Sequence, residues 1–563
     1  MQKNIPLNEY PRPQLVRESY YSLNGVWDYK ITTKLEMPTV WDGEILVPYS
    51  PECPMSGVER IVTPKDYLYY RKVFDLPSEV NNDKIILHFT AVDQIGEVFM
   101  NGHYLGYHVG GFLPFEFDIK PYVQDKDNVL IVRVKDFTDT SYHARGKQKT
   151  KRGGIWYSPQ SGIYLPVWLE GVSNDYIKSI KLTPNIDEEI IEITVNSSSN
   201  FAKLTFFNKV IEIPTNEIYK LKVNDPILWS PDNPYLYYFT LETENDKVSS
   251  YFAMRKFSTI VDKDGHRRLA LNNKPLFMKG LLDQGYWDKS WLTPRNEQDY
   301  INDILLAKQM GYNVLRKHIK LETLRWYYHC DRIGMIVWQD FVNGGSKYSW
   351  WWITTPLITH SRMSDKNYLL LARTSKKGKL QSIQEYKDTI EYLYNVPSIA
   401  LWTIFNEGWG QFDAKNVYKE MVAIDNTRIY DHASGWYDQG VSDTCSLHIY
   451  YQPVYIPKKH VLKGRSLIVS ECGGNTLPIE GHRFNNDEIC GILKYETKED
   501  WMNEYRRFIK EDIIANIPKG LSAFIYTQVS DVEDEINGLV TYDREVVKFD
   551  IDEMREINNK VHL

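Results

Sequence analysis

The pattern of hydrophobic and polar positions changes twice along the chain. Up to about residue 172, short segments of aromatic and β-branched residues recur with glycine and proline between them, as at 68–74. Many short strands without a long helix predict an antiparallel sandwich of the jelly-roll type. Asn101-Gly102 separates two of these segments and predicts a tight hairpin, because both central residues must take positive φ. Residues 1–172 are therefore expected to form a jelly-roll domain.

The second region, residues 173–257, keeps the strand signals but is more polar. Residues 191–195 alternate between apolar and polar side chains, and residues 237–242 form another strand pattern. A segment of this size and pattern is typical of an immunoglobulin-like sandwich. An extension of the first pair of sheets is the alternative.

In the third region, residues 258–563, strand and helix patterns alternate. Helices are expected over 297–310 and 322–333, each close to an apolar strand. Eight apolar strands alternating with helices predict a (β/α)₈ barrel, so the fold class is multidomain, with two β-sandwiches before an α/β barrel. The eight strand patterns lie at 275–282, 312–318, 335–340, 399–407, 428–433, 446–450, 466–471 and 521–528.

Composition narrows the classes of partner. Lys and Arg number 67 against 74 Asp and Glu, so no basic excess favours nucleic acid or an anionic membrane. No apolar run approaches the roughly 20 residues of a membrane helix, and no apolar leader is visible at the start. The five cysteines are scattered and contain no C-x-x-C pair, which argues against disulfides or zinc and favours the cytoplasm. Aromatic residues reach 14%, which would suit stacking against the apolar faces of sugars.

Two of the predicted barrel strands end in glutamate. Glu407 follows the apolar run 401–405, and Glu471 follows 467–469. The carboxyl ends of barrel strands form one face, so both carboxylates should project into the same pocket, near Trp409. Cleavage of a glycosidic bond needs such a pair, because one carboxyl protonates the leaving oxygen while the other attacks the anomeric carbon or activates water.

The segment 395–407, ending in Asn406-Glu407, resembles the acid/base signature of glycoside hydrolase family 2. This family contains β-galactosidases, β-glucuronidases and β-mannosidases. Segments 313–318 and 470–474 are similar to its second barrel signature and to its nucleophile segment. The segments that resemble its sugar-binding jelly roll are 22–27, 101–102, 110–119 and 161–170.

The resemblance implies a role for each matching residue. Glu407 would be the general acid/base and Glu471 the nucleophile of a retaining enzyme, with the two carboxyl groups about 5 to 5.5 Å apart. The expected substrate-binding residues are Asn406 at the sugar 2-hydroxyl, Arg316 beside the nucleophile, His318 at the sugar, Tyr450 bonded to the nucleophile, and Trp409.

The sequence also departs from the family pattern. Ile319-Lys320 stands where Tyr-Pro usually follows Arg-x-His, so the pocket floor is expected to differ. The glutamate and histidine that hold magnesium in the large β-galactosidases find no match, so neither a metal nor another cofactor is expected. The Asn-x-Lys pair that reads the carboxylate of a glucuronide is not evident; Asn537-Gly-Leu stands in that region.

Two further groups are candidates for the pocket wall. Asp283 and Asp340 follow the first and third strands and are expected to contact substrate, although a structural turn is an equal alternative for Asp283. Residues 350–352 are three tryptophans in a long insertion. They could form a sugar-stacking lid or, equally, a contact between two copies of the chain.

Together these features predict a cytoplasmic, retaining, exo-acting β-glycosidase of β-galactoside type. It would act on a small carbohydrate, need no cofactor, bind neither nucleic acid nor membrane, and possess a surface suited to a homo-oligomer. The alternatives are the same chemistry on a β-mannoside, β-glucuronide or furanoside, or a carbohydrate-binding protein without activity.

Overall fold

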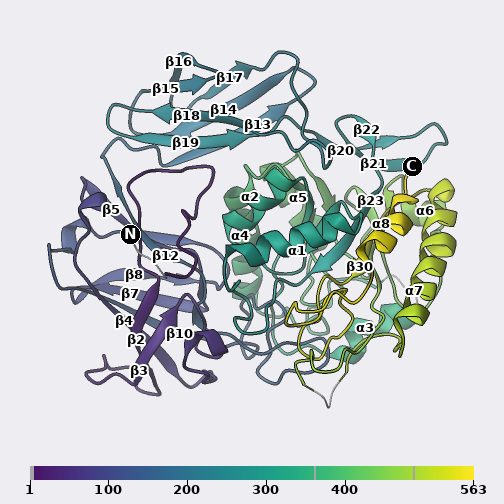
Figure 1. Cartoon of the computed structure of the whole chain (residues 1–563), viewed down its shortest axis with the longest axis horizontal. Helices are drawn as coiled ribbons and strands as arrows, with labels where there is room; N and C mark the ends of the chain where they lie inside the picture. Colours follow the sequence, from purple (N-terminus) through teal and green to yellow (C-terminus); the bar gives the residue numbers. More distant parts are fainter. Residues whose placement is uncertain (1–4, 360–362, 486–488) are drawn as a thin grey trace.

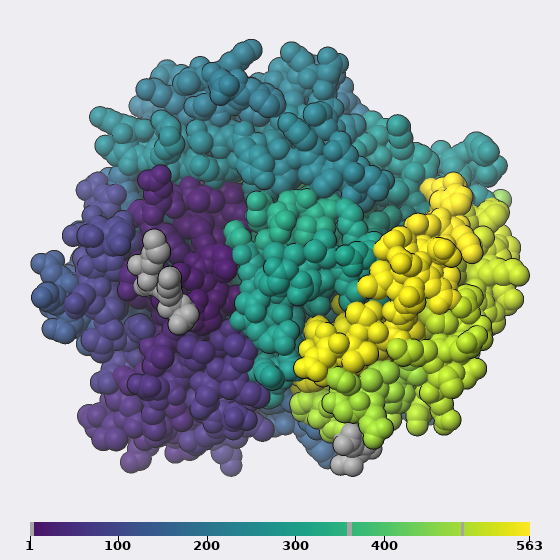
Figure 2. Space-filling model, viewed as in Figure 1, coloured from purple at the N-terminus to yellow at the C-terminus, as the bar shows by residue number. Residues whose placement is uncertain are grey.

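The computed structural model describes residues 5–359, 363–485 and 489–563. Three parts follow one another along the chain (Figure 1): a sandwich at the left of the view, a smaller sandwich above, and a barrel at the right. In Figure 2 the N-terminal sandwich lies directly against the first half of the barrel, and the hydroxyl group of Tyr49 donates to the Arg295 carbonyl 2.9 Å away at this contact. The predicted fold class is confirmed.

The first sandwich packs a six-stranded antiparallel sheet on a four-stranded one around a core that includes Trp27 and Leu87. Asn101 and Gly102 have φ of 47° and 81° and join β7 to β8, which confirms the predicted hairpin. The strands are β1 (Tyr21–Ser22), β2 (Gly25–Thr32), β3 (Gly43–Val47), β4 (Tyr67–Phe74), β5 (Lys84–Phe89), β6 (Val92–Asp93), β7 (Ile95–Met100), β8 (His103–Val109), β9 (Phe115–Asp118), β10 (Asn128–Lys135), β11 (Gly162–Ile163) and β12 (Val167–Val172).

The second sandwich pairs a three-stranded sheet with a four-stranded one, and alternate residues of each strand face a core of Ile, Val, Leu and Phe side chains. Both strands predicted here, at 191–195 and 237–242, are present. The strands are β13 (Ser179–Asn185), β14 (Ile190–Asn196), β15 (Phe201–Phe206), β16 (Lys209–Pro214), β17 (Ile218–Lys222), β18 (Tyr237–Glu242) and β19 (Lys247–Phe252).

The barrel contains eight parallel strands that neighbour one another in chain order, each at a place where an apolar run predicted it. Hydrogen-bonded pairing runs around the sheet from β28 through β29 and β30 to β27, so the barrel is closed except between β27 and β28. The strands are β23 (Met278–Asp283), β24 (Val314–Lys317), β25 (Ile336–Asp340), β26 (Ile399–Thr403), β27 (Ile429–Asp431), β28 (Thr444–Ile449), β29 (Ser466–Gly473) and β30 (Leu521–Thr527).

Helices surround these strands, and both predicted helices are confirmed by α1 and α2. The side chain of Asn296 caps α1 by accepting from the amide of Gln298. The helices are α1 (Glu297–Gln309), α2 (Leu324–Ile333), α3 (Trp350–Thr359), α4 (Lys376–Leu393), α5 (Ala414–Ile424), α6 (Lys459–Leu462), α7 (Lys498–Arg507) and α8 (Ile551–Asn559), with short π and 3₁₀ turns over Phe508–Ile513 and Ile514–Lys519. No helix among the described residues is both long and apolar enough to span a membrane.

A small sheet that the sequence did not predict covers the amino-terminal end of the barrel. It consists of β20 (Phe257–Val261), β21 (Arg267–Leu271) and β22 (Lys274–Pro275). Arg268 donates to the carbonyl of Leu521 at 2.7 Å, where the last barrel strand begins. With this end covered, the opposite end remains for a functional site.

The opposite end receives a long segment of the first sandwich, residues 136–161, which connects β10 to β11. The amide of Arg145 donates to the carbonyl of Asn343 at 3.0 Å, just beyond β25. Arg152 donates to both carboxylate oxygens of Asp534 at 2.9 and 2.8 Å. This segment therefore reaches across the carboxyl ends of the barrel strands.

Candidate active site

The two predicted glutamates meet at the carboxyl ends of their strands. Glu407 lies just beyond β26, and its positive φ of 53° is rare for a residue with a side chain. Its amide donates to the Ser434 carbonyl at 2.9 Å, which fixes this turn. Glu471 lies within β29. One oxygen of each carboxylate and one nitrogen of His448 lie within 4.8 Å of one another.

Glu471 is held as an anion. The hydroxyl group of Tyr450 donates to its Oε2 at 2.5 Å, and Arg316 Nη1 donates to its Oε1 at 3.1 Å. Burial alone would raise the pKa of Glu471, but electrostatic interactions with His448, Arg316 and His318 outweigh it and lower that pKa to about 2. An ionised carboxylate with a free lone pair is the form that attacks carbon.

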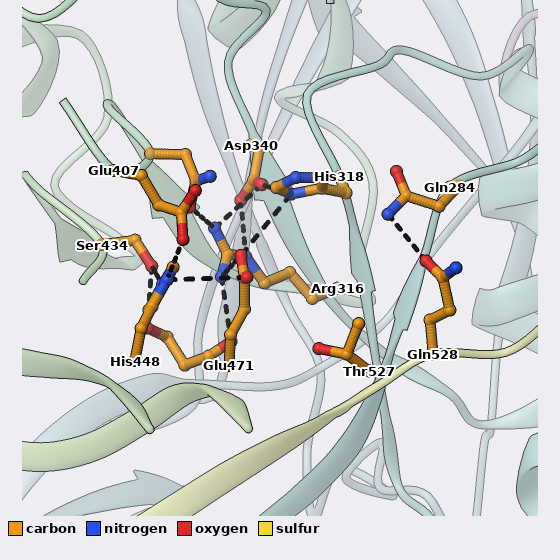
Figure 3. Close-up of polar contacts among 12 residues, drawn as sticks. Gln284, Arg316, His318, Asp340, Glu407, Ser434, His448, Glu471, Thr527 and Gln528 are labelled. Carbon is orange, nitrogen blue, oxygen red and sulfur yellow. Dashed lines mark hydrogen bonds and ion pairs between the residues drawn. The ribbon is translucent and has the colours of Figure 1, made fainter. Parts of the chain in front are cut away.

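Arg316 organises the layer beneath the pocket (Figure 3). It is fully buried and forms two parallel bonds of 3.0 Å to Asp340, and its Nη2 donates to Asn406 Oδ1 at 2.9 Å. Burial would raise the pKa of Asp340, but Arg316 and His318 hold it below its ordinary value. A buried charge of either sign is costly unless it is paired and bonded in this way.

Glu407 has two partners. Trp409 Nε1 donates to its Oε2 at 3.0 Å, and His448 Nδ1 lies 2.8 Å from its Oε1. The same His448 nitrogen is 3.5 Å from Glu471, so the imidazole stands between the two carboxylates, as Figure 3 shows.

A chain of hydroxyl groups extends from the second ring nitrogen of His448. Ser470 donates to the carbonyl of Leu447 at 3.4 Å, and Ser434 donates to Ser470 at 2.7 Å. Ser434 Oγ in turn lies 2.9 Å from His448 Nε2, and Ser446 Oγ also contacts Ser470. The imidazole therefore connects Glu407 on one side of the ring with these hydroxyl groups on the other.

Glu407 and Glu471 line a cavity of about 250 Å³. The barrel contributes most of the wall, Trp350 and Thr354 of α3 add an edge, and Lys147, Ile155 and Trp156 come from the first sandwich. The ring of Trp350 lies 5.6 Å from that of Trp409, between centroids. Trp351 is not part of the wall, and 70% of it is exposed.

The structure separates the predicted residues into two layers. Those that line the cavity are Glu407, Glu471, Asn406, His318, Tyr450 and Trp409. Arg316, Asp340 and Asp283 lie outside the lining. Asp283 instead accepts from buried Lys317 at 2.8 Å, which places it in a separate ion network beside the pocket. Ile319 does line the cavity, while Lys320 turns away to Glu322 at 2.6 Å.

Several lining residues were absent from the sequence-based list, above all Lys147 and Glu535. His448, which contacts Glu407, was also absent from that list. It was detectable, because it lies two positions before Tyr450, which directly follows β28, and residues two apart on an extended chain share a face. Lys147 belongs to another domain, and only the tertiary structure brings it to the barrel.

Two groups in the described part of the chain have the geometry to hold a metal ion. One is Glu407, His448 and Glu471, the candidate catalytic group itself. The other is His482, Asp543 and Glu545 near the surface, where His482 lies 2.7 Å from Asp543. The expectation that no metal is needed stays a prediction.

Comparison with known families follows the three parts of the fold. The model described as glycosyl hydrolases family 2, sugar binding domain, matches residues 54–169, and the general family 2 model matches 173–255. The model of the family 2 TIM barrel domain matches residues 263–563, more than half of the chain. The chain belongs to glycosyl hydrolase family 2. This confirms the family that the motifs resembled.

Within family 2, similar curated proteins carry different names. A β-galactosidase of Thermoanaerobacter pseudethanolicus is 26% identical over 63% of this chain and 46% of its own length. A putative β-glucuronidase of Formosa agariphila is 25% identical over 62% of this chain and 40% of its own length. The chain therefore spans less than half of either relative.

Solved structures of family 2 share the fold over nearly the whole chain. A β-D-glucuronidase of Dictyoglomus thermophilum superposes with a TM-score of 0.75 at 19% identity, covering 98% of this chain and 99% of the other. A β-galacturonidase of Eisenbergiella tayi, bound to galacturonate, gives 0.71 at 17% identity, covering 98% and 99%.

Proposed function

We propose that this protein is a retaining, exo-acting β-glycosidase that releases terminal sugars from β-galactoside-type substrates. The observation that carries the proposal is the carboxylate pair at the cavity, with nearest oxygens of Glu407 and Glu471 within 4.8 Å. A spacing near 5 Å suits direct attack by one carboxylate, whereas inverting enzymes leave roughly 6.5 to 9.5 Å for a water molecule.

In the first step, Glu471 attacks the anomeric carbon as the bond to the leaving oxygen breaks. The proton held between Glu407 and His448 passes through Glu407 to that oxygen. Glu471 then forms an ester with the sugar, and the leaving group departs as a neutral alcohol.

In the second step, water enters where the alcohol left. Glu407 and His448 take its proton back, the water oxygen bonds to the anomeric carbon, and the ester bond to Glu471 breaks. Arg316 and Tyr450 favour this release because they stabilise the restored carboxylate. The sugar leaves with its original anomeric configuration.

The remaining residues have positioning roles in this proposal. Asn406 directs its oxygen to Arg316 and so has its amide nitrogen available to donate to the sugar 2-hydroxyl group. His318 is oriented by Asp340, 2.8 Å from its Nδ1, and lines the cavity on the sugar side. Trp409 and Trp350 supply aromatic surface for the apolar face of a sugar ring.

The curated relatives named β-galactosidase support the galactoside as substrate, while the uronidases among the solved structures support an acid sugar as the competing candidate. The proposal also includes three domains, at residues 1–172, 173–257 and 258–563. It includes a cytoplasmic location and a reaction without a cofactor. The paired, bonded arrangement of both glutamates argues against a purely carbohydrate-binding role.

A panel of nitrophenyl glycosides tests the proposal. Wild type should cleave at least one β-glycoside with retention, as followed by NMR of the first sugar released, and Glu471→Gln should not. If Glu471→Gln cleaved the same glycoside at the wild-type rate, the assignment of the nucleophile would be wrong.

A further inference from the structure

Three consecutive acidic residues after the last barrel strand meet the segment 136–161 of the first sandwich. Glu533 accepts from the amide of Ser158 at 3.0 Å. Asp534 accepts the two hydrogen bonds from Arg152 that are described above. Glu535 accepts from Lys147 at 3.4 Å and, through a short contact, from the hydroxyl group of Tyr157. Each carboxylate therefore has its own partner in the N-terminal domain.

Glu535 differs from its two neighbours because it alone lines the cavity. Both side-chain contacts fall on Oε2. Among the described residues nothing bonds to Oε1, although the residue is only 5% exposed. One oxygen is thus fixed by the other domain, while its partner remains available as an acceptor in the cavity.

The loop that carries Glu535 is anchored from its other side as well. Gln528 Nε2 donates to Asn537 Oδ1 at 2.7 Å, and Gln284 Nε2 donates to Gln528 Oε1 at 2.8 Å, the pair seen at the right of Figure 3. Asn537 lines the same cavity. Glu535 is therefore held in position before any substrate binds, as is required of a residue that recognises a ligand.

The cavity lining offers no unpaired ammonium group among the described residues. Its one lysine, Lys147, is already paired with Glu535, and the charge of Glu471 is balanced by Arg316 from outside the lining. A substrate carboxylate would bring another anion into this enclosed space, where like charges repel strongly. Hydroxyl groups, in contrast, would donate to Glu535 and gain charge-assisted hydrogen bonds.

We propose that Glu535 is a specificity-determining residue that accepts hydrogen bonds from sugar hydroxyl groups and restricts the site to uncharged sugars. This rests on the proposed glycosidase function and decides between its two substrate candidates. A preference for uncharged sugars would distinguish this chain from the structural neighbours named glucuronidase and galacturonidase.

The test uses pairs of nitrophenyl substrates that differ only in the oxidation of C6, β-galactoside with β-galacturonide and β-glucoside with β-glucuronide. Wild type should prefer the neutral member by at least about 100-fold in kcat/KM, as expected for unpaired like charges. Glu535→Gln should lower kcat/KM for the neutral sugar by about 10- to 100-fold and raise the uronide-to-neutral ratio about tenfold or more.

Glu533→Gln is the matched control. Burial raises the pKa of Glu533 to about 7, so an amide is a close substitute for its neutral form, and it lies at the same domain junction outside the cavity lining. Its ratio of uronide to neutral turnover should equal that of wild type. An equal change of that ratio in both variants would mean that the junction acts only through structure, and the proposal would fail.

A binding measurement separates this inference from the proposed function. In the Glu471→Gln chain, calorimetry with methyl β-galactoside and methyl β-galacturonide needs no turnover. The neutral sugar should bind more tightly. Tighter binding of the uronide, with loss of that binding in Lys147→Met, would assign the cavity to acid sugars and overturn the inference while leaving the glycosidase chemistry intact.

Discussion

The floor of the cavity and its rim are built by different means. The floor consists of strand ends from a single barrel, and its charges satisfy one another, as in the bonds of Arg316 to Asp340, Glu471 and Asn406. The rim combines α3, the segment 136–161 and the loop after β30, which are distant in sequence. The difference suggests that the floor performs the chemistry and the rim selects the sugar.

The largest effect should come from the floor. Glu471→Ala should lower kcat by about 10⁴- to 10⁶-fold for every glycoside, because no other group supplies the attacking oxygen. Glu407→Ala should cost about 10²- to 10⁴-fold for alkyl glycosides and far less for dinitrophenyl glycosides, whose leaving groups need no proton in the first step.

Azide distinguishes these two variants by stereochemistry. Added azide should yield the α-glycosyl azide with Glu471→Ala and the β-glycosyl azide with Glu407→Ala, as read by NMR. Equal losses for both leaving-group classes in Glu407→Ala would contradict its role as the proton donor.

A change of pH dependence should follow from removing the residue between the two glutamates. His448→Gln removes the electrostatic interaction with His448 that lowers the pKa of Glu471, so that pKa should rise from about 2 toward its ordinary value of 4.5. The acid limb of the pH profile of kcat/KM should then shift to higher pH by about one unit or more, so that activity begins to fall below about pH 5.

His432→Gln is the control for that shift. His432 is also buried, but it bonds to Ser442 at 2.8 Å and pairs with Asp438 rather than with either glutamate. Its acid limb should stay at the wild-type position. A limb that moves equally in both variants would point to a general loss of stability, which thermal melts at each pH would reveal.

Folding stability should respond to acid through the same carboxylate. The pKa of Glu471 is lower in the folded state than its ordinary value, so its contribution is complete above about pH 5 and is lost as the pH falls toward 2. Between pH 6 and pH 8, the contribution of this carboxylate to the free energy of unfolding should therefore stay constant.

Smaller effects are expected at the rim. Trp350→Ala removes a ring from the cavity wall beside Trp409 and should lower kcat/KM about tenfold for disaccharides and less for aryl glycosides, which depend less on remote binding. Trp351→Ala, at an exposed neighbouring ring, should change neither class by more than about twofold. Equal losses in both variants would indicate that α3 acts through its fold or through association of two copies.

The smallest effect should be that of chelation. Dialysis against EDTA should leave kcat unchanged, since the proposed mechanism uses protons and a carboxylate and no step requires a cation. Loss of activity restored by magnesium would point to one of the two acid-histidine groups. Repeating the assay with His482→Ala would show whether the surface group with Asp543 is responsible.

Sequence patterns predicted the floor better than the rim, for a physical reason. Every barrel strand is a short apolar run, and a glutamate that follows such a run lies at the catalytic face whatever the loops do. The small sheet of β20 to β22 was missed because its strands are only five, five and two residues long. The assignments of the individual site residues and the exact domain boundaries remain predictions.

The rim depends on contacts that no local pattern records. Nothing near Lys147 indicates a barrel, and nothing near Glu535 indicates a jelly roll, although the two are 388 positions apart and bonded. The helix α3 was also hidden, because three consecutive tryptophans in an insertion could serve equally as a loop.

The junction between residues 136–161 and 533–535 also has a consequence for the order of events during synthesis. Chains emerge from the ribosome with the N-terminal part first, and domains tend to fold as they appear. The sandwich that supplies Lys147 and Arg152 can therefore be complete while the acidic residues that bind them are still untranslated. The complete cavity is among the last features to form, so a nascent chain that already holds Glu407 and Glu471 would still lack the rim that we propose selects the sugar.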